Sequence, residues 1–163
     1  MTDSQKQPVR KQVQLAELDP LIRETLAVGG AFRMTITGTS NLPTLTGGRD
    51  QVTLVQVNGR LRKYDLPLYI RDNGQYILHR IVSEQKNGTY TCCGDHQWKR
   101  ERGIRPDQII GYVSEICRNG KQFSVQNRAY RIWVRVWVFL LPCRGFLIRV
   151  YHASGSIKRF LRK

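Results

Sequence analysis

Three short turns built on the dipeptide Asn-Gly constrain the fold of this chain more than any other feature of its sequence. They occupy residues 72–74, 86–88 and 118–120. Asn and Gly tolerate the left-handed backbone of tight hairpin turns, so each turn predicts that the runs on either side pair as antiparallel strands. Several such hairpins in one chain predict a mainly β (α+β) fold, a small coiled β-sheet or barrel.

Short apolar runs between the turns mark the strands. Phe32, Met34 and Ile36 alternate with polar residues, which is the period of a strand with one buried face. The loop that follows, residues 38–48, is rich in Thr, Ser, Asn, Pro and Gly. The further strands are predicted at residues 51–57, 66–70, 76–82, 89–93, 109–117 and 121–125.

Helical spacing is confined to the two ends of the chain. Near the N-terminus a short helix is predicted over residues 19–28. Asp19 would cap this helix and Pro20 would occupy its first position, where the missing N–H of proline does no harm. The pair Gly29-Gly30 would then end it.

The last part of the chain, residues 129–163, is also predicted to be helical, because apolar and aromatic residues recur there at helical spacing beside arginines. Pro142 and Gly145 are expected to break this helix, and a second amphipathic piece to follow over 146–162. The chain thus divides into an N-terminal tail and helix, a β domain and a basic aromatic helical segment, with the bounds 1–30, 31–127 and 128–163.

Positive charge is concentrated in that C-terminal segment. The net charge of the chain is +15, and residues 128–163 hold seven Arg and two Lys with no Asp or Glu. A basic aromatic helix suits the interface of an anionic membrane, so contact with such a surface through residues 130–163 is one expectation. The alternative is that the aromatic stripe packs on the β domain and the arginines are only solvated. Nucleic acid is less favoured as a partner, because the chain carries no nucleic-acid-binding motif.

No targeting peptide, membrane-spanning helix, metal site or cofactor is predicted. Residues 1–12 are polar, and the apolar stretch 132–150 is interrupted by charges, Pro and Gly. The four Cys form no Cys-x-x-Cys pair, and Cys92 and Cys93 are expected on opposite faces of one strand. The expected location is cytoplasmic or peripherally membrane-associated.

Three segments carry residues suited to acyl-transfer chemistry. Ser40 follows the first strand, where a hydroxyl and free backbone N–H groups could supply a nucleophile and an oxyanion site. His79 offers a base that titrates near neutral pH. Asp95 or Glu101 could orient that imidazole as the third member of a triad. Taken singly, the segments also read as an ordinary turn, a histidine at the core edge and a solvated turn.

The order of these segments resembles the superfamily of signal peptidase I and LexA-like serine peptidases. The family pattern is G-x-S-M-x-P, G-D-x-V, a Lys or His before Arg-Ile/Val-Val, K-G-D-N and I-x-G-x-V. Over residues 35–116, about half of the chain, this sequence reads GTSNLPTL, GRDQV, LHRIV, CGDHQ and IIGYV in the same order. The flanking runs at 18–38 and 64–82 and the closing aromatic-Arg helix are similar to a soluble bacterial branch of the superfamily.

The resemblance implies a serine endopeptidase of the Ser–His subtype that cleaves an extended signal or leader peptide. Ser40 stands at the position of the nucleophile and His79 at the position of the general base. Asp95 belongs to the Gly-Asp motif that begins at Gly94, and it ranks ahead of Glu101 as the acid behind the imidazole.

The loop around the nucleophile comprises Gly38, Thr39, Asn41 and Pro43. The family has Met directly after the nucleophile, and Asn41 departs from that pattern. This departure keeps a second function open, a weak or inactive peptidase-like module that binds peptides. Because Gly38 stands where bacterial signal peptidases carry a serine, the oxyanion would depend on backbone N–H groups, such as that of Ser40, or on Thr39.

Two further expectations concern the surroundings of the site. Asp50 matches the Asp of the G-D-x-V motif and is expected to be structural. The substrate is expected to lie extended against the strands at 32–37 and 66–70, where it would add a strand to an open sheet edge. By resemblance, small side chains would be favoured before the cut.

Overall fold

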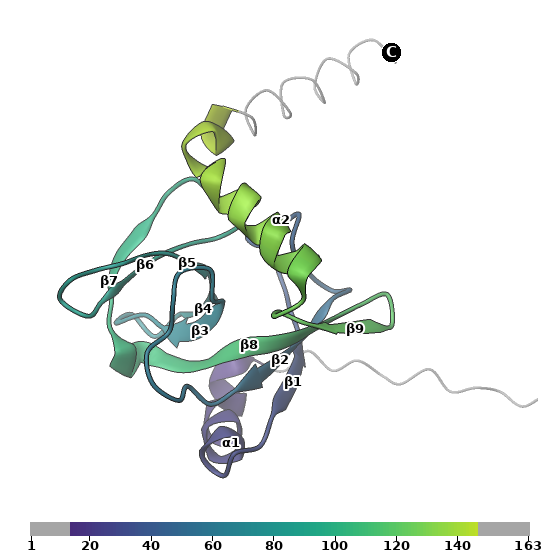
Figure 1. The fold of residues 1–163 in the computed structure, drawn as a ribbon. Helices are drawn as coiled ribbons and strands as arrows, with labels where there is room; N and C mark the ends of the chain where they lie inside the picture. The colour runs from purple at the N-terminus through teal and green to yellow at the C-terminus, as the bar shows by residue number, and fades with distance from the viewer. Residues whose placement is uncertain (1–13, 147–163) are drawn as a thin grey trace, which may run out of the picture.

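A curled six-stranded antiparallel sheet forms the centre of the fold, and a computed structural model describes it over residues 14–146 (Figure 1). The strand order is β1-β2-β8-β3-β4, with β9 paired to β8. The strands are β1 (Phe32–Thr35), β2 (Gln51–Val55), β3 (Pro67–Ile70), β4 (Tyr76–Leu78), β8 (Ile109–Arg118) and β9 (Lys121–Ser124). A smaller sheet contains β5 (Arg80–Glu84), β6 (Tyr90–Cys93) and β7 (Glu101–Ile104). The helices are α1 (Leu15–Ala27), the 3₁₀ turn η1 (Pro106–Gln108) and α2 (Arg128–Phe139).

The Asn-Gly turns close the hairpins that the sequence predicts. They join β3 to β4, β5 to β6 and β8 to β9, and all three strand pairs are antiparallel. In the last of these turns Asn119 and Gly120 both have positive φ, 51° and 75°, as a tight two-residue hairpin requires. The register of β8 shifts against both β2 and β3, and such irregularities increase the bend of a sheet. The expected mainly β fold with a few helices is confirmed.

The core consists of apolar clusters on either side of the curled sheet. Ile22 and Leu26 of α1 are buried against strand residues that include Leu54. A second cluster joins the two sheets through Tyr69 of β3 and Ile81 of β5. Burial of these side chains removes each from water and contributes on the order of 2 kcal/mol apiece.

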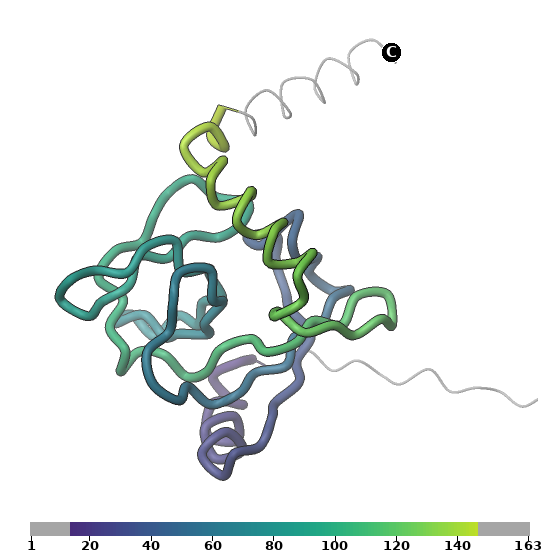
Figure 2. Tube along the Cα trace, in the orientation of Figure 1, coloured from purple at the N-terminus to yellow at the C-terminus, as the bar shows by residue number. Residues whose placement is uncertain are grey.

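Helix α2 covers part of the smaller sheet. Its residues Val134 and Val138 pack on Val82 and Cys93. Cys92 belongs instead to the cluster between the two sheets, so the neighbouring cysteines face opposite sides of β6, as predicted. Figure 2 shows α2 running along the outer edge of the molecule, with one long side away from the strands.

Helix α1 begins earlier than predicted. It starts at Leu15, so Asp19 is not its N-cap and Pro20 lies inside it. Asp19 instead forms an ion pair with Arg23, one turn later, at 3.0 Å. Pro20 removes a single helical hydrogen bond near the helix start, and packing of the apolar face against the sheet offsets that loss.

The run predicted as one strand over residues 76–82 is two strands in different sheets. β4 ends at Leu78 and β5 begins at Arg80, with His79 between them. Both halves are apolar, so the pattern of the sequence does not mark the break. β7 was not predicted, because two of its four residues are exposed and apolar alternation is missing.

The C-terminal helix ends before the residues that were expected to break it. α2 ends at Phe139, and Leu140 forms a turn before residues 141–146 return to helix. Pro142 therefore lies in the first turn of the second helical piece, where proline is tolerated. The remainder of the predicted second piece lies outside the described residues. Within residues 14–146, no helix has the length and apolarity to cross a bilayer.

Candidate active site

Ser40 lies on a tight turn shortly after β1. Gly38 in this turn has a φ of +75°, the left-handed backbone that favours glycine. The turn lies close to the end of its own loop, because a Cβ added at Gly47 would clash with the Gly38 carbonyl oxygen. Ser40 is half-buried, whereas Thr39 and Pro43 are exposed, so the turn is open to solvent on one side.

His79 occupies the single position at which the chain passes from the larger sheet to the smaller one. Its side chain is 5% exposed. The imidazole meets the ring of Tyr69 edge-on, with the ring centroids 6.5 Å apart. Because strands hold the backbone on both sides, this histidine has a fixed position in the fold.

Gly94 is the point at which the serine turn and the histidine meet. A Cβ added to it would lie 2.6 Å from the carbonyl oxygen of Ser40 and 3.0 Å from Nε2 of His79. The N–H of His96 donates to the same Ser40 carbonyl at 2.8 Å. Only glycine leaves room for this approach, which gives a physical reason for the Gly of the Gly-Asp motif. The fold thus brings Ser40, His79 and the Gly94 loop together.

Asn41 links the serine turn to the strand that leads into His79. Its Nδ2 donates to the carbonyl oxygen of Leu78 at 2.8 Å, and the side chain is buried. Its Oδ1 is buried and has no hydrogen-bond partner among the described residues. The Asn41 amide therefore joins the serine turn to the strand that leads into His79 by a hydrogen bond.

Asp95 forms a buried ion pair with Arg80. Arg80 Nε donates to Oδ1 at 2.9 Å and Arg80 Nη2 donates to Oδ2 at 2.7 Å. Each side chain is 1% exposed. Because both carboxylate oxygens are engaged by the guanidinium, this pairing favours a structural role for Asp95 and does not support its rank ahead of Glu101.

Glu101 and His79 line the same pocket. Glu101 accepts hydrogen bonds from the Tyr69 hydroxyl at 2.9 Å and from Arg71 Nη2 at 2.6 Å. Of the two nearby carboxylates, its charge has the larger effect on His79, and it raises the pKa of that histidine. Arg71 and Tyr69 therefore fix the position of Glu101 in the pocket that His79 also lines.

Burial lowers the pKa of His79 from 6.5 to about 4. Removal from water disfavours the charged imidazolium, and this effect outweighs the opposing charges of Glu101 and Asp95. Arg71 lowers the pKa further. His79 is therefore neutral at pH 7 and able to accept a proton.

The lowered pKa of His79 predicts a pH dependence of stability. The folded chain binds fewer protons than the unfolded chain between about pH 4 and 6.5, so this contribution is present above pH 6.5 and lost as the pH falls toward 4. Between pH 7 and pH 4 we expect the unfolding free energy to fall by about 3 kcal/mol more in the parent chain than in His79→Gln. Denaturant unfolding of both chains measures the difference, and equal slopes against pH would contradict it.

Asp50 lies where the serine loop ends and β2 begins. It is fully buried and accepts hydrogen bonds from the Thr46 N–H at 3.0 Å and from Arg49 Nε at 2.7 Å. Arg118 Nε donates to it at 3.3 Å. Asp50 thus ties the end of the loop to β8, and these contacts give it a structural role.

Two residues near the C-terminus hold the Gly94 loop from outside, and sequence reasoning missed both. Arg144 is buried and donates to the carbonyl oxygens of Gly94 and Gln97, at 3.2 Å each. Trp137 Nε1 donates to the carbonyl oxygen of Asp95 at 2.8 Å. In the sequence, Arg144 stands out only because no Asp or Glu lies near it in the chain. This observation does not identify the groups to which Arg144 donates.

A pocket of about 580 Å³ opens beside His79. Exposed Trp98 gives it an apolar wall, and the ion pair of Arg71 with Glu101 gives it a charged one. Gln97, Lys99 and Arg100 complete the lining. Such a mixture of one apolar surface and a few polar groups suits a bound side chain.

No protein-family model matches the chain, and no curated protein matches it. Among the residues that the structure describes, no cluster of His, Cys, Asp and Glu is placed to bind a metal ion. The function must therefore be inferred from the residues that meet at Gly94.

Proposed function

We propose that the protein is a serine endopeptidase of the signal peptidase and LexA-like superfamily, and that it cleaves an extended signal or leader peptide. The observation that carries this proposal is the approach of Ser40 and His79 to one glycine. A Cβ added to Gly94 would lie 2.6 Å from the backbone carbonyl oxygen of Ser40 and 3.0 Å from Nε2 of His79. A serine beside a buried, neutral imidazole has the composition of a Ser–His dyad.

In this mechanism His79 accepts the hydroxyl proton as Ser40 Oγ attacks the peptide carbonyl carbon. The C–N bond breaks as the imidazolium returns that proton to the leaving amine, and Ser40 remains acylated. Water, which gives its proton to the same imidazole, then breaks the ester and restores the hydroxyl. Backbone N–H groups of the serine turn stabilise each oxyanion, by about 3–4 kcal/mol per donor.

Glu101 supports the imidazolium that forms during the reaction. The charge of Glu101 raises the pKa of His79, whereas burial lowers it. Arg71 and Tyr69 hold the carboxylate by hydrogen bonds of 2.6–2.9 Å. The acid therefore makes the proton transfer less unfavourable without accepting the proton itself.

Two sheet edges end at the site and could receive the substrate. Within the described residues, β1, β4 and β9 each pair with a single strand of the larger sheet, and β1 and β4 are the two that lead toward the site. β1 leads into the turn of Ser40, and β4 leads into His79. The expectation that the strand at 66–70 offers an open edge is wrong, because β3 lies between β8 and β4. An extended peptide is therefore expected to pair with β1 or β4.

The second candidate function is a peptide-binding module without strong activity. Asn41 favours it, because its buried Oδ1 has no partner among the described residues, beside the position of the nucleophile. A buried acceptor without a partner destabilises the serine turn, whereas the methionine of the family pattern would bring no polar atom that needs one. The two functions share the substrate edges and differ in the reactivity of Ser40.

Labelling with a fluorophosphonate separates the two functions. Between about pH 6 and 9 we expect covalent modification at Ser40, located by mass spectrometry, because neutral His79 accepts the hydroxyl proton. Ser40→Ala and His79→Ala should both lose it. Ser124→Ala, an exposed serine on β9, is the matched control and should label like the parent chain. If the parent chain stays unlabelled but still binds extended peptides, the binding module replaces the peptidase.

A further inference from the structure

Helix α2 carries three stripes of different chemistry. Tyr130, Val134 and Val138 face the β domain and pack against it. On the opposite side, Ile132, Val136 and Phe139 are 61%, 49% and 82% exposed. The third stripe lies between these two and recurs at helical spacing. It consists of the exposed residues Arg128, Arg131 and Arg135. A helix that is already packed on one side therefore presents a second apolar side to its surroundings.

A cationic pocket of about 510 Å³ lies between α2 and the segment 58–66. Its lining includes the cations Arg62, Lys63, Arg131 and Arg135, and Asp65 is the one acid in it among the described residues. The Asp65 carboxylate accepts the backbone N–H of Arg62 at 2.8 Å. Cations thus outnumber acids in the lining, and the pocket suits an anionic group.

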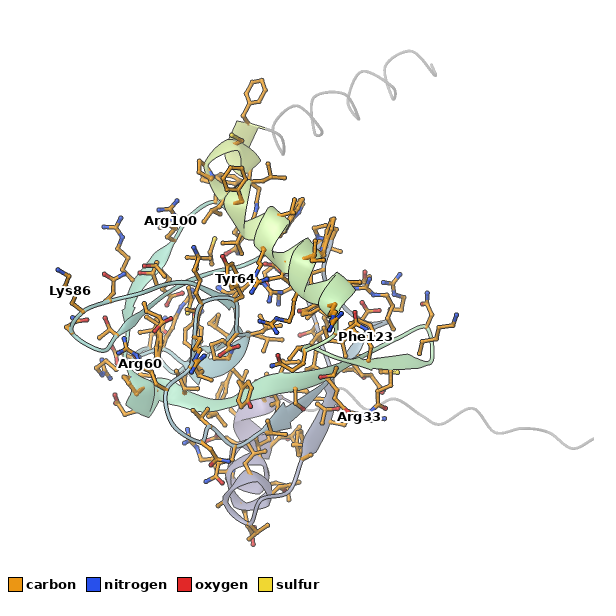
Figure 3. All side chains as sticks on the ribbon, in the orientation of Figure 1. Arg33, Arg60, Tyr64, Lys86, Arg100 and Phe123 are labelled. Atoms are coloured by element: carbon orange, nitrogen blue, oxygen red, sulfur yellow. The ribbon has the colours of Figure 1, made fainter. Side chains whose placement is uncertain are left out.

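Tyr64 also lines this pocket. Its backbone has a φ of +86°, a conformation that residues other than glycine rarely adopt. Lys63 Nζ lies 5.2 Å and the Arg135 guanidinium 5.8 Å from the centre of its ring. Figure 3 shows Tyr64 beside α2, with Arg60 at the opposite end of the same segment. The ring thus contacts one cation from each wall of the pocket, Lys63 from the segment 58–66 and Arg135 from α2.

We propose that α2 and this pocket dock the protein on an anionic phospholipid bilayer. Ile132, Val136 and Phe139 would enter the interface, and the pocket with Arg131 and Arg135 would meet lipid phosphates. This proposal does not rest on the peptidase function. Since Trp137 and Arg144 tie the same segment to the Gly94 loop, docking would hold that loop at the membrane surface.

Charge and apolarity together select this occupant. A second copy of the chain is disfavoured, because each copy carries +15 and the stripe has arginines beside it. A nucleic acid would engage the arginines and leave the apolar stripe of Ile132, Val136 and Phe139 in water. An anionic bilayer is the partner that covers both.

Sedimentation with vesicles tests the proposal on the full chain. We expect binding to vesicles that contain phosphatidylglycerol, none to pure phosphatidylcholine, and weaker binding at high salt. The double variant Arg131→Gln/Arg135→Gln should bind about 25-fold more weakly, since each arginine near the surface contributes about fivefold. Phe139→Ser should weaken binding about tenfold. Arg33→Gln/Lys86→Gln removes equal charge far from α2 and is the matched control (Figure 3), expected to change binding less than about threefold.

Several outcomes would overturn the proposal. One is the absence of binding to anionic vesicles at low salt, and another is equal binding to neutral ones. If the control weakens binding as much as the α2 variants, net charge and not this surface is responsible. If the α2 variants have no effect, lipid is bound elsewhere in the chain. Self-association that Phe139→Ser abolishes would make a second copy the occupant, and duplex DNA binding lost in Arg131→Gln/Arg135→Gln would make it a nucleic acid.

Discussion

Replacing Asp95 with alanine is expected to lower the free energy of unfolding by about 3–5 kcal/mol, because it leaves a buried guanidinium without its counter-charge. Arg80 is 1% exposed. Its other partners, the Tyr64 carbonyl at 2.9 Å and the Tyr130 hydroxyl at 3.2 Å, are uncharged. They satisfy hydrogen bonds but do not neutralise the cation. Chemical unfolding at pH 7, followed by fluorescence or circular dichroism, measures the loss.

Two variants control the Asp95 experiment. Asp107→Ala removes an exposed acid whose ion pair with Arg105 lies at the surface, and should change stability by less than about 0.5 kcal/mol. Removing both buried charges in Arg80→Met/Asp95→Leu should recover most of the loss, because no unpaired ion remains. A loss of less than about 1 kcal/mol in Asp95→Ala would show that the buried pair does not set the stability of this loop.

His79→Ala is expected to lower peptide hydrolysis about 10⁴-fold or more, because Ser40 then has no base to take its proton. Glu101→Gln should cost only about tenfold, since its carboxylate supports the imidazolium but transfers no proton. The measurement is kcat/KM on fluorogenic peptides with small residues before the scissile bond. Free imidazole should restore part of the rate in His79→Ala, and Lys86→Ala should behave like the parent chain. Hydrolysis that survives in His79→Ala would remove this residue from the mechanism.

The pH profile of the same reaction carries a signature of the buried histidine. Activity requires the neutral imidazole, whose pKa is lowered to about 4, so the acid limb should fall near pH 4 and not near 6.5. At pH 5 about nine-tenths of the rate should remain. Glu101→Gln removes a charge that raises this pKa, so the limb should move to still lower pH. A limb near pH 6.5 in the parent chain would mean that the reacting imidazole is solvated.

The hairpins could be predicted because turn chemistry is local. Asn and Gly permit a left-handed backbone wherever they stand, and the alternation of Phe32, Met34 and Ile36 needs no distant partner. The helix start was misplaced for the opposite reason. Asp19 and Pro20 are typical of a helix start, but burial of the α1 face extended the helix beyond that local preference.

Within the candidate site, the sequence predicts that the turn of Ser40 and the position of His79 belong together, and the fold brings both to Gly94, but the sequence does not show which cation each acid meets. Ser40 and His79 stand in short motifs whose order is visible in the chain. The choice between Asp95 and Glu101 depends on which cation each one meets across the fold, Arg80 or Arg71. Arg71 lies in the turn between β3 and β4, and Arg80 begins β5. Their spacing in the sequence does not show which acid pairs with which arginine.

By itself, then, the sequence determined a β-rich chain with hairpins closed at the Asn-Gly turns, because those preferences act within a few residues. Only the tertiary structure decided that His79 sits between two sheets, that Gly94 leaves room for it beside Ser40, and that Arg144 holds the same loop from outside. In the chain, Gly94 is 15 positions from His79, 54 from Ser40 and 50 from Arg144. Packing of the core and the need to pair buried charges decide which of these residues meet. Neither can be read from the order of residues in the chain.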